Sequence, residues 1–188
     1  MELLIILGVL VAAGLAVAAI YNRLVALRQN RHNAYADIDV QLKQRFDLIP
    51  NLIETVKGYA SHEKDVFEEV TKMRAKVEEA DGQGERLQAE QLLGKAMLNV
   101  MAVAENYPDL KADQTFQQLM ADLSDIENKI AAARRFFNNA TSELNTAVQQ
   151  FPANLIANMF GFKEEEFYEV SEEERDVMEK APEVKFGT

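Results

Sequence analysis

An uncharged apolar segment near the amino terminus constrains this chain more than any other feature. Residues 3–20 are all apolar or glycine, and no charged side chain occurs before Arg23 except Glu2. A helix of about 20 residues is about 30 Å long, which matches the hydrocarbon core of a bilayer. We therefore predict a single transmembrane anchor over residues 1–22.

A cleaved signal peptide is the alternative interpretation, because Ala16-Val17-Ala18 is similar to a small-x-small cleavage site. Signal peptides begin with a positively charged region, whereas Met1 and Glu2 supply no Lys or Arg. The apolar run is also longer than the usual core of a signal peptide. We therefore expect the segment to be retained.

The charges that follow the span predict its orientation. Arg23, Arg28 and Arg31 come first, and the next acidic residue is Asp37. The positive-inside rule then places the amino terminus outside and the remaining chain in the cytoplasm, as a single-pass protein of the cell (inner) membrane. The opposite orientation, with an external domain, stays open because short amino-terminal anchors often adopt it.

The spacing of apolar residues predicts helices throughout. Apolar positions recur at steps of three and four over residues 20–60, 66–77, 89–103 and 116–151. The chain has only 8 Gly and 4 Pro, so it is poor in residues that punctuate β structure. We predict an all-α fold in which residues 23–151 form an antiparallel up-and-down four-helix bundle with long first and fourth helices.

Individual residues predict where these helices begin and end. Pro50 predicts a bend in the first helix, and Ser61 is a candidate N-cap for the second. Pro108 should end the third helix, Asp113 should cap the fourth, and Pro152 should close it.

Residue types that carry common chemistry are missing. The chain has no Cys, and its 2 His, at positions 32 and 62, lack the Glu-x-x-His spacing of a bundle di-iron site. With 20 Lys and Arg against 31 Asp and Glu, the net charge of −11 argues against nucleic-acid binding. We therefore expect no catalytic, cofactor or metal site.

Charged and amide side chains lie beside the apolar stripes of the first and fourth helices. They form either an exposed ladder, such as Asp39 with Lys43, worth a few tenths of a kcal/mol, or a partly buried polar layer that fixes helix register. The candidate residues of this layer are Asp37, Asp39, Gln41, Arg45, Glu127, Asn128, Arg134 and Asn138.

The unequal helix lengths predict self-association. Two helices of nearly 40 residues cannot be covered by two of about 20, so an apolar stripe near the membrane should stay bare. Such a stripe usually marks an interface, and we expect a homo-oligomer. The candidate interface residues are Leu24, Leu27, Ile38, Phe137, Leu144 and Val148.

Two segments follow the bundle. Residues 152–162 are apolar and should be delivered near the bilayer, where they either lie on the membrane surface or pack over the bare stripe. Residues 163–188 carry ten acidic and four basic side chains, a net charge of −6, and form either a solvated tail or a docking element for a basic partner. The apolar residues singled out are Phe151, Leu155, Ile156, Met159 and Phe160.

Several blocks of sequence resemble the LemA family of bacterial membrane proteins. They are DIDVQLKQRFDLIPNL at 37–52, VKGY at 56–59, HE at 62–63, YPDLKA at 107–112, ENKIAAARR at 127–135, FPANLIA at 151–157, FGF at 160–162 and PEVKF at 182–186. The resemblance implies one amino-terminal span and an up-and-down helical bundle. It implies no established enzymatic activity, only associations with membrane-protease neighbours, stress responses and organelle membrane shaping.

Two functional hypotheses remain. The first is a membrane-anchored, self-assembling scaffold or adaptor without catalytic activity. The second is a regulatory partner of a membrane protease or stress-response system that docks through the acidic tail. The expected partners are the lipid bilayer, further copies of the chain and other membrane proteins, but not nucleic acid.

Overall fold

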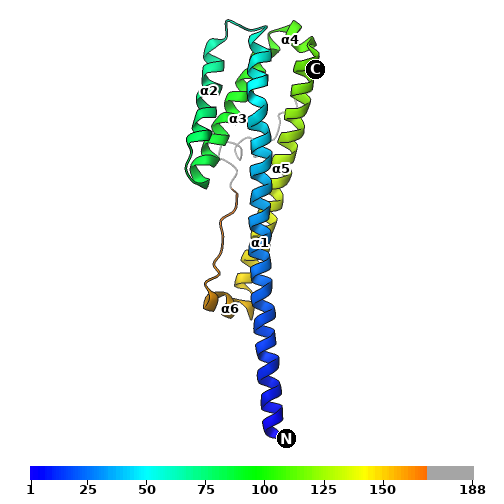
Figure 1. Ribbon diagram of the computed structural model, residues 1–188, viewed down its shortest axis with the longest axis vertical. Coiled ribbons are helices and arrows are strands. Elements are labelled where there is room, and N and C mark those ends of the chain that lie inside the picture. Colours follow the sequence, from blue (N-terminus) through cyan, green and yellow to red (C-terminus); the bar gives the residue numbers. More distant parts are fainter. Residues whose placement is uncertain (169–188) are drawn as a thin grey trace, which may run out of the picture. The chain divides into compact units, whose positions relative to one another are not determined.

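The structure, a computed structural model, describes residues 1–168 and confirms the all-helical fold (Figure 1). No strand occurs within this described range. The helices are α1 (Glu2–Lys57), α2 (Lys64–Glu79), α3 (Gln83–Glu105), α4 (Pro108–Ala112), α5 (Gln114–Gln149) and α6 (Ala153–Phe160).

The chain divides into two compact units, and the division falls within the two longest helices. The first unit contains Met1–Tyr35 and the chain from Arg134 onward, and the second contains Ala36–Ala133. We call them the membrane-proximal unit and the bundle unit. Each is described separately below.

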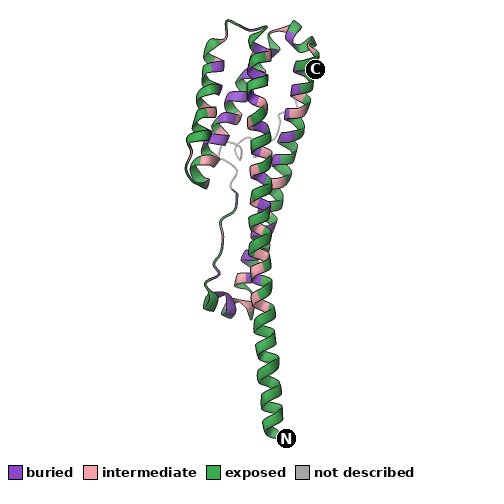
Figure 2. Cartoon of the chain, in the orientation of Figure 1, coloured by how far each residue is buried: buried purple, intermediate pink, exposed green. Residues whose placement is uncertain are grey.

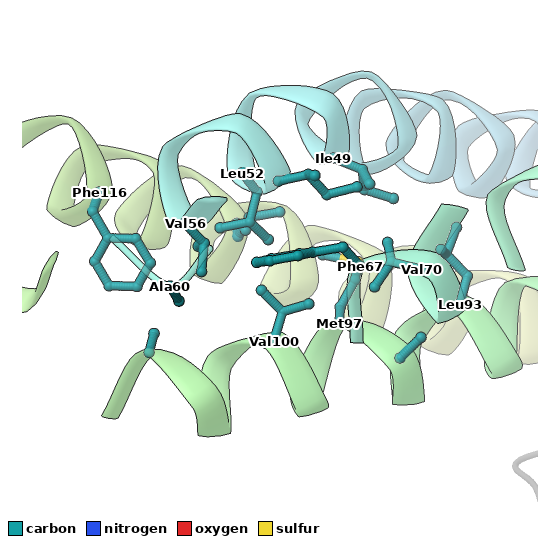
Figure 3. Packing of buried hydrophobic residues seen from close by; sticks show 14 of the residues in the cluster. Ile49, Leu52, Val56, Ala60, Phe67, Val70, Leu93, Met97, Val100 and Phe116 are labelled. Atoms are coloured by element: carbon teal, nitrogen blue, oxygen red, sulfur yellow. The ribbon is translucent and has the colours of Figure 1, made fainter. Parts of the chain in front are cut away.

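The bundle unit has a core to which five helices contribute, including α4 through Leu110. Figure 3 shows Ile49, Leu52 and Val56 of α1 directed toward Phe67 of α2. The cluster continues with the buried residues Val70 and Val77 of α2, Ala89, Leu93, Met97 and Val100 of α3, and Phe116 and Leu123 of α5. Most of the buried residues lie at the predicted three-and-four-spaced positions, so the helical period placed most of this core.

Most of the predicted helix ends agree with the structure to within two residues. The α3 helix ends at Glu105 ahead of Pro108, and the Phe116 N–H donates to Asp113 Oδ1 at 2.9 Å, so Asp113 caps α5. The α1 helix continues through Pro50 to Lys57. Pro108 also begins a short helix, α4, which the sequence analysis missed.

The predicted N-cap at Ser61 is wrong. The α2 helix begins three residues later, at Lys64, and no side chain caps it. Buried Ala60 explains the shift, because its N–H bonds to the Val56 carbonyl at 2.8 Å and its carbonyl accepts from the Glu63 N–H at 3.1 Å. The chain therefore turns once more beyond Ser61 before the helix starts.

The membrane-proximal unit combines one end of α1 with one end of α5, α6 and a non-helical segment. Residues 1–19 of α1 are exposed, as Figure 2 shows in green, and they are long and apolar enough to cross a membrane. Beyond them, Leu24 packs against Ala147 of α5 and Ile156 of α6.

A turn at Gly161 connects α6 to the segment that we call the arm, residues 161–168. Gly161 has a φ of +73°, a left-handed conformation that glycine adopts without a steric cost. The turn allows the Phe162 N–H to bond to the Ala157 carbonyl at 2.9 Å, which closes α6. From there the arm leaves α6 without helical turns (Figure 1).

Candidate functional site

Two groups of polar side chains stand out, one in each unit. The first group surrounds Arg45, which lies on the core side of α1 and is only 3% exposed. Its Nη1 donates to Glu127 Oε1 at 3.0 Å, and its Nη2 donates to both the backbone carbonyl and the carboxylate of Glu90. Arg45 therefore joins α1, α3 and α5 of the bundle unit.

The electrostatics of this group keep Arg45 charged. Burial alone lowers the pKa of the guanidinium, but the carboxylates of Glu127 and Glu90 outweigh burial and hold the pKa above its usual value. Glu90 is 2% exposed, so its charge is almost entirely removed from water. A buried charge of this kind is tolerated only with a partner of opposite sign and further hydrogen bonds.

The sequence identified Arg45 and Glu127 as layer residues, and the structure brings them together. It missed Glu90, because an acidic residue beside the apolar stripe of a third helix resembles any solvated side chain. The other four layer candidates of the bundle unit do not contact Arg45 in any hydrogen bond or ion pair. Asp37 and Asn128 are exposed, Gln41 is half-buried, and Asp39 lies 3.8 Å from Arg86 in a surface pair.

The second polar group binds the arm to α5 in the membrane-proximal unit. The Asn145 side chain donates to the Glu165 carbonyl at 2.9 Å and accepts from the Glu165 N–H at 2.8 Å. Asn138 makes the same pair of bonds with Tyr168, at 3.2 and 2.8 Å. Each asparagine therefore satisfies both backbone groups of one arm residue.

The two asparagine pairs fit because their spacings agree. Asn138 and Asn145 are seven residues apart, or about 10.5 Å along a helix. Glu165 and Tyr168 are three residues apart, or about 10 Å in extended chain. The residue numbers run in opposite directions, so the arm runs antiparallel to α5.

Arg31 of α1 strengthens the attachment of the arm to α5. Its Nε donates to Thr141 Oγ1 at 3.1 Å, and its Nη2 donates to the Glu166 carbonyl at 2.9 Å. The guanidinium also lies over the Phe137 ring, at 4.7 Å from the centroid. An arginine that the sequence analysis used only for membrane orientation thus links α1, α5 and the arm.

Aromatic residues anchor both ends of the arm. Phe162 is buried beside Tyr21, at 5.9 Å between ring centroids, with Arg28 over its face. Tyr168 packs edge-on against Phe137, at 6.3 Å, and Arg134 lies over its ring. The predicted layer residues Arg134 and Asn138 therefore hold the arm; they do not join the Arg45 group.

The arm and α6 overturn the reason for the predicted oligomer interface. The stripe expected to be bare is covered within the chain: Leu24, Ile38, Phe137 and Leu144 are 1–3% exposed. Leu27 and Val148 are half-buried. The sequence analysis gave packing of residues 152–162 over the stripe as one of two alternatives, and Ile156 and Phe162 join the cluster around Leu24. Self-association remains a prediction, now without an exposed stripe to support it.

The apolar segment after α5 is divided between the two predicted environments. Ile156 is buried against α1 and α5, as expected for packing over the stripe. Phe151, Leu155, Met159 and Phe160 keep 50–79% of their surface exposed. The segment therefore packs on its own chain with one face and leaves an apolar face uncovered.

Comparison with known proteins identifies the family. The family model described as the LemA family matches residues 34–186. The chain belongs to the LemA family. The matched range contains both the Arg45 group and the arm with its asparagines, but it begins after the apolar span and after Arg31.

Relatives of this LemA-family chain are distant. They include magnetosome protein MamQ of Magnetospirillum gryphiswaldense, 26% identical over 79% of this chain and 64% of that protein, and magnetosome protein MamQ 2 of Paramagnetospirillum magneticum, 27% identical over the same shares. Protein LemA of Metamycoplasma hominis is 23% identical over 82% of this chain and 71% of its own length. The chain thus spans just under two thirds of the two magnetosome proteins, and none of these names states an activity.

Proposed function

We propose that this LemA-family chain is a membrane-anchored helical scaffold or adaptor without catalytic activity. The observation that carries the proposal is the continuity of α1 from Glu2 to Lys57. Its exposed apolar residues suit a bilayer, and the same helix supplies Ile49, Leu52 and Val56 to a packed core. Anchor and bundle core are therefore parts of one element.

The use of polar residues supports a structural role. Arg45 is held by two carboxylates, and Asn138 and Asn145 of α5 bond to backbone groups of the arm. Within residues 1–168, no group of three or more His, Asp or Glu side chains is arranged to hold a metal ion. The side chains of Arg45, Asn138 and Asn145 instead make internal contacts that hold segments of the chain together.

Membrane extraction tests the anchor. We expect the full chain to stay in the membrane pellet after alkaline carbonate extraction, and a variant lacking residues 2–20 to move to the supernatant with its remaining helices folded. Cross-linking in native membranes followed by mass spectrometry then tests the scaffold. Recovery of cross-links only within the chain, with no protein partner and no second copy, would contradict it.

We place the bundle unit in the cytoplasm, as the positive-inside rule indicates. Arg28 and Arg31 also contact the arm, so these two arginines have a structural role besides membrane orientation. Of the three arginines, Arg23 is the one explained by membrane orientation alone. Protease added to intact spheroplasts should leave the bundle unit whole. Digestion under these conditions would show the opposite orientation.

Docking through the acidic tail is the alternative, and residues 169–188 lie outside the described range. A truncation for this test should end after Tyr168, because removal from residue 163 would also remove the arm contacts of Asn138 and Asn145. If docking operates, the truncated protein loses partners that the full chain retains. An unchanged partner set would exclude the tail as the docking element.

A further inference from the structure

The exposed surface of α6 has two different sides. Helical residues advance by about 100°, so exposed Leu155 and Met159 share one side, while exposed Asn158 and half-buried Asn154 share the adjacent one. Ile156 and Ala157, on the remaining face, are 7% and 0% exposed. A helix fully surrounded by water would gain nothing from a separate apolar side.

The apolar side of α6 is substantial for so short a helix. Leu155 is 57% exposed and Met159 is 73% exposed. Phe151, in the turn that precedes α6, is 79% exposed. Residues 151–162 contain no charged side chain, so nothing in this segment opposes transfer out of water.

Contacts with α1 place α6 at the end of the apolar span. The Phe160 ring packs on Tyr21, with 4.8 Å between centroids, and Ile20 and Leu24 belong to the cluster around Ile156. Tyr21 is the first residue after the uninterrupted apolar run, in the position where tyrosines mark the interface of lipid and water. Within this unit, α6 runs across the direction of α1 (Figure 1).

We propose that α6 lies in the headgroup region of the bilayer that α1 crosses, with Leu155 and Met159 directed toward the acyl chains. The proposal rests on α1 being the membrane anchor. A helix that runs across a membrane-spanning helix lies close to the membrane plane, as interfacial helices do. Exposed Asn158 then remains on the side of the headgroups and water.

The anchor explains why so small a helix is sufficient. An isolated eight-residue helix without Lys or Arg binds membranes weakly. Here α1 holds α6 beside the bilayer, so insertion is intramolecular and needs little affinity of its own. The apolar side of α6 adds a second point of attachment to the bilayer. It thereby restrains how α1 tilts and rotates in the membrane.

Depth-dependent quenching tests the proposal in full-length protein reconstituted into phosphatidylcholine vesicles. The chain has no Cys, so Met159→Cys and the matched control Asn158→Cys can each carry one nitrobenzoxadiazole label. We expect label at position 159 to be quenched by doxyl-labelled lipid and protected from aqueous iodide. Label at position 158 should show the reverse preference.

Each other outcome overturns the proposal. Iodide quenching at position 159 would mean that this side of α6 faces water. Protection from both quenchers would mean that protein covers this side, and a second copy of the chain would then be the covering protein to test. Flotation of the labelled protein with the vesicles reports the anchor independently. Failure of α6 insertion is therefore distinguishable from failure of membrane anchoring.

Discussion

Arg45 shows how much a single buried charge can determine in a helical bundle. Replacing it with methionine keeps the volume of the side chain but leaves Glu90, 2% exposed, without its cation. Removing one member of a buried pair costs about 3–5 kcal/mol, because the remaining charge is uncompensated. We expect Arg45→Met to lower the free energy of unfolding by an amount in this range, measured by urea titration of helical circular dichroism.

Two further variants separate charge from packing. Lys43→Met removes the exposed pair with Asp47, and surface pairs contribute at most about 1 kcal/mol, so its effect should be small. The double variant Arg45→Met with Glu90→Leu should recover most of the lost stability, because no buried charge remains. A double variant as unstable as Arg45→Met alone would contradict the assignment.

Asp113 predicts a pH effect at the residue scale. The Phe116 N–H, and secondly the Tyr59 hydroxyl, lower the pKa of the Asp113 carboxyl below its usual value of about 3.9. A lowered pKa in the folded state stabilises the fold above the unfolded pKa, and this stabilisation is lost as the pH falls through the folded pKa. Acid should therefore weaken this cap.

The variant Asp113→Asn isolates that effect. Asparagine caps helices about as well as aspartate but does not titrate in this range. We expect the melting temperature of the wild-type protein to fall more steeply than that of the variant between about pH 5 and pH 3. Parallel pH profiles of the two proteins would show that Asp113 contributes nothing to acid sensitivity.

At the scale of elements, the arm depends on α5 for hydrogen-bond partners. Asn138→Ala and Asn145→Ala each remove two bonds to the arm, and alanine favours the helix, so α5 itself should not suffer. With about 1 kcal/mol per bond, each variant should speed amide hydrogen exchange at Glu165 or Tyr168 by about tenfold or more. Exchange measured by NMR or mass spectrometry gives the result.

Asn139 supplies the control for this prediction. It is the exposed neighbour of Asn138 on α5 and takes part in none of the arm's hydrogen bonds within residues 1–168. Asn139→Ala should therefore leave exchange in the arm unchanged. Equal acceleration in all three variants would point to a general loosening of α5.

The same elements show what sequence can and cannot predict here. The stripes through Leu52, Val70 and Leu123 located the helices, because burial on one helical face leaves a three-and-four period. Asp113 and Pro108 located helix ends through local hydrogen bonding. The apolar residues of the arm follow no helical period. The position of the arm depends on Asn138 and Asn145, which resemble any exposed pair of asparagines until the arm itself is placed against α5.

The Arg45 group illustrates the same limit within a site. Arg45 and Glu127 attracted notice because each interrupts a pattern on a long helix. Glu90 completes the group from α3, and only tertiary packing determines which acidic residue meets the arginine. Sequence therefore indicated that a polar layer exists, but it could not determine the membership of the layer.

At the scale of the whole molecule, the chain covers its own apolar stripe with residues that follow α5. Truncation after Gln150 removes α6 and the arm, and so removes the residues that pack on Leu24 and Phe137. Exposed stripes of this kind promote association. We expect the truncated protein in detergent to sediment as a larger species than the full chain at the same concentration.

A milder truncation provides the comparison. Ending the chain after Tyr168 removes much of the net charge of the tail but keeps the cover over the stripe. This protein should sediment like the full chain. If it associates as strongly as the protein ended after Gln150, loss of charge would explain association and the cover would not.

Attachment of the arm through its backbone has a consequence for how this region can change over generations. The Asn145 side chain bonds to the backbone N–H and the backbone carbonyl of residue 165. Every amino acid except proline has both of these groups. The Glu165 side chain adds only a surface ion pair with Arg31. Position 165 can therefore accept any of the nineteen residues other than proline, whereas Asn145 cannot be replaced without loss of both bonds. In this part of the chain we expect substitutions to accumulate in the arm and not at the asparagines of α5 that bind it.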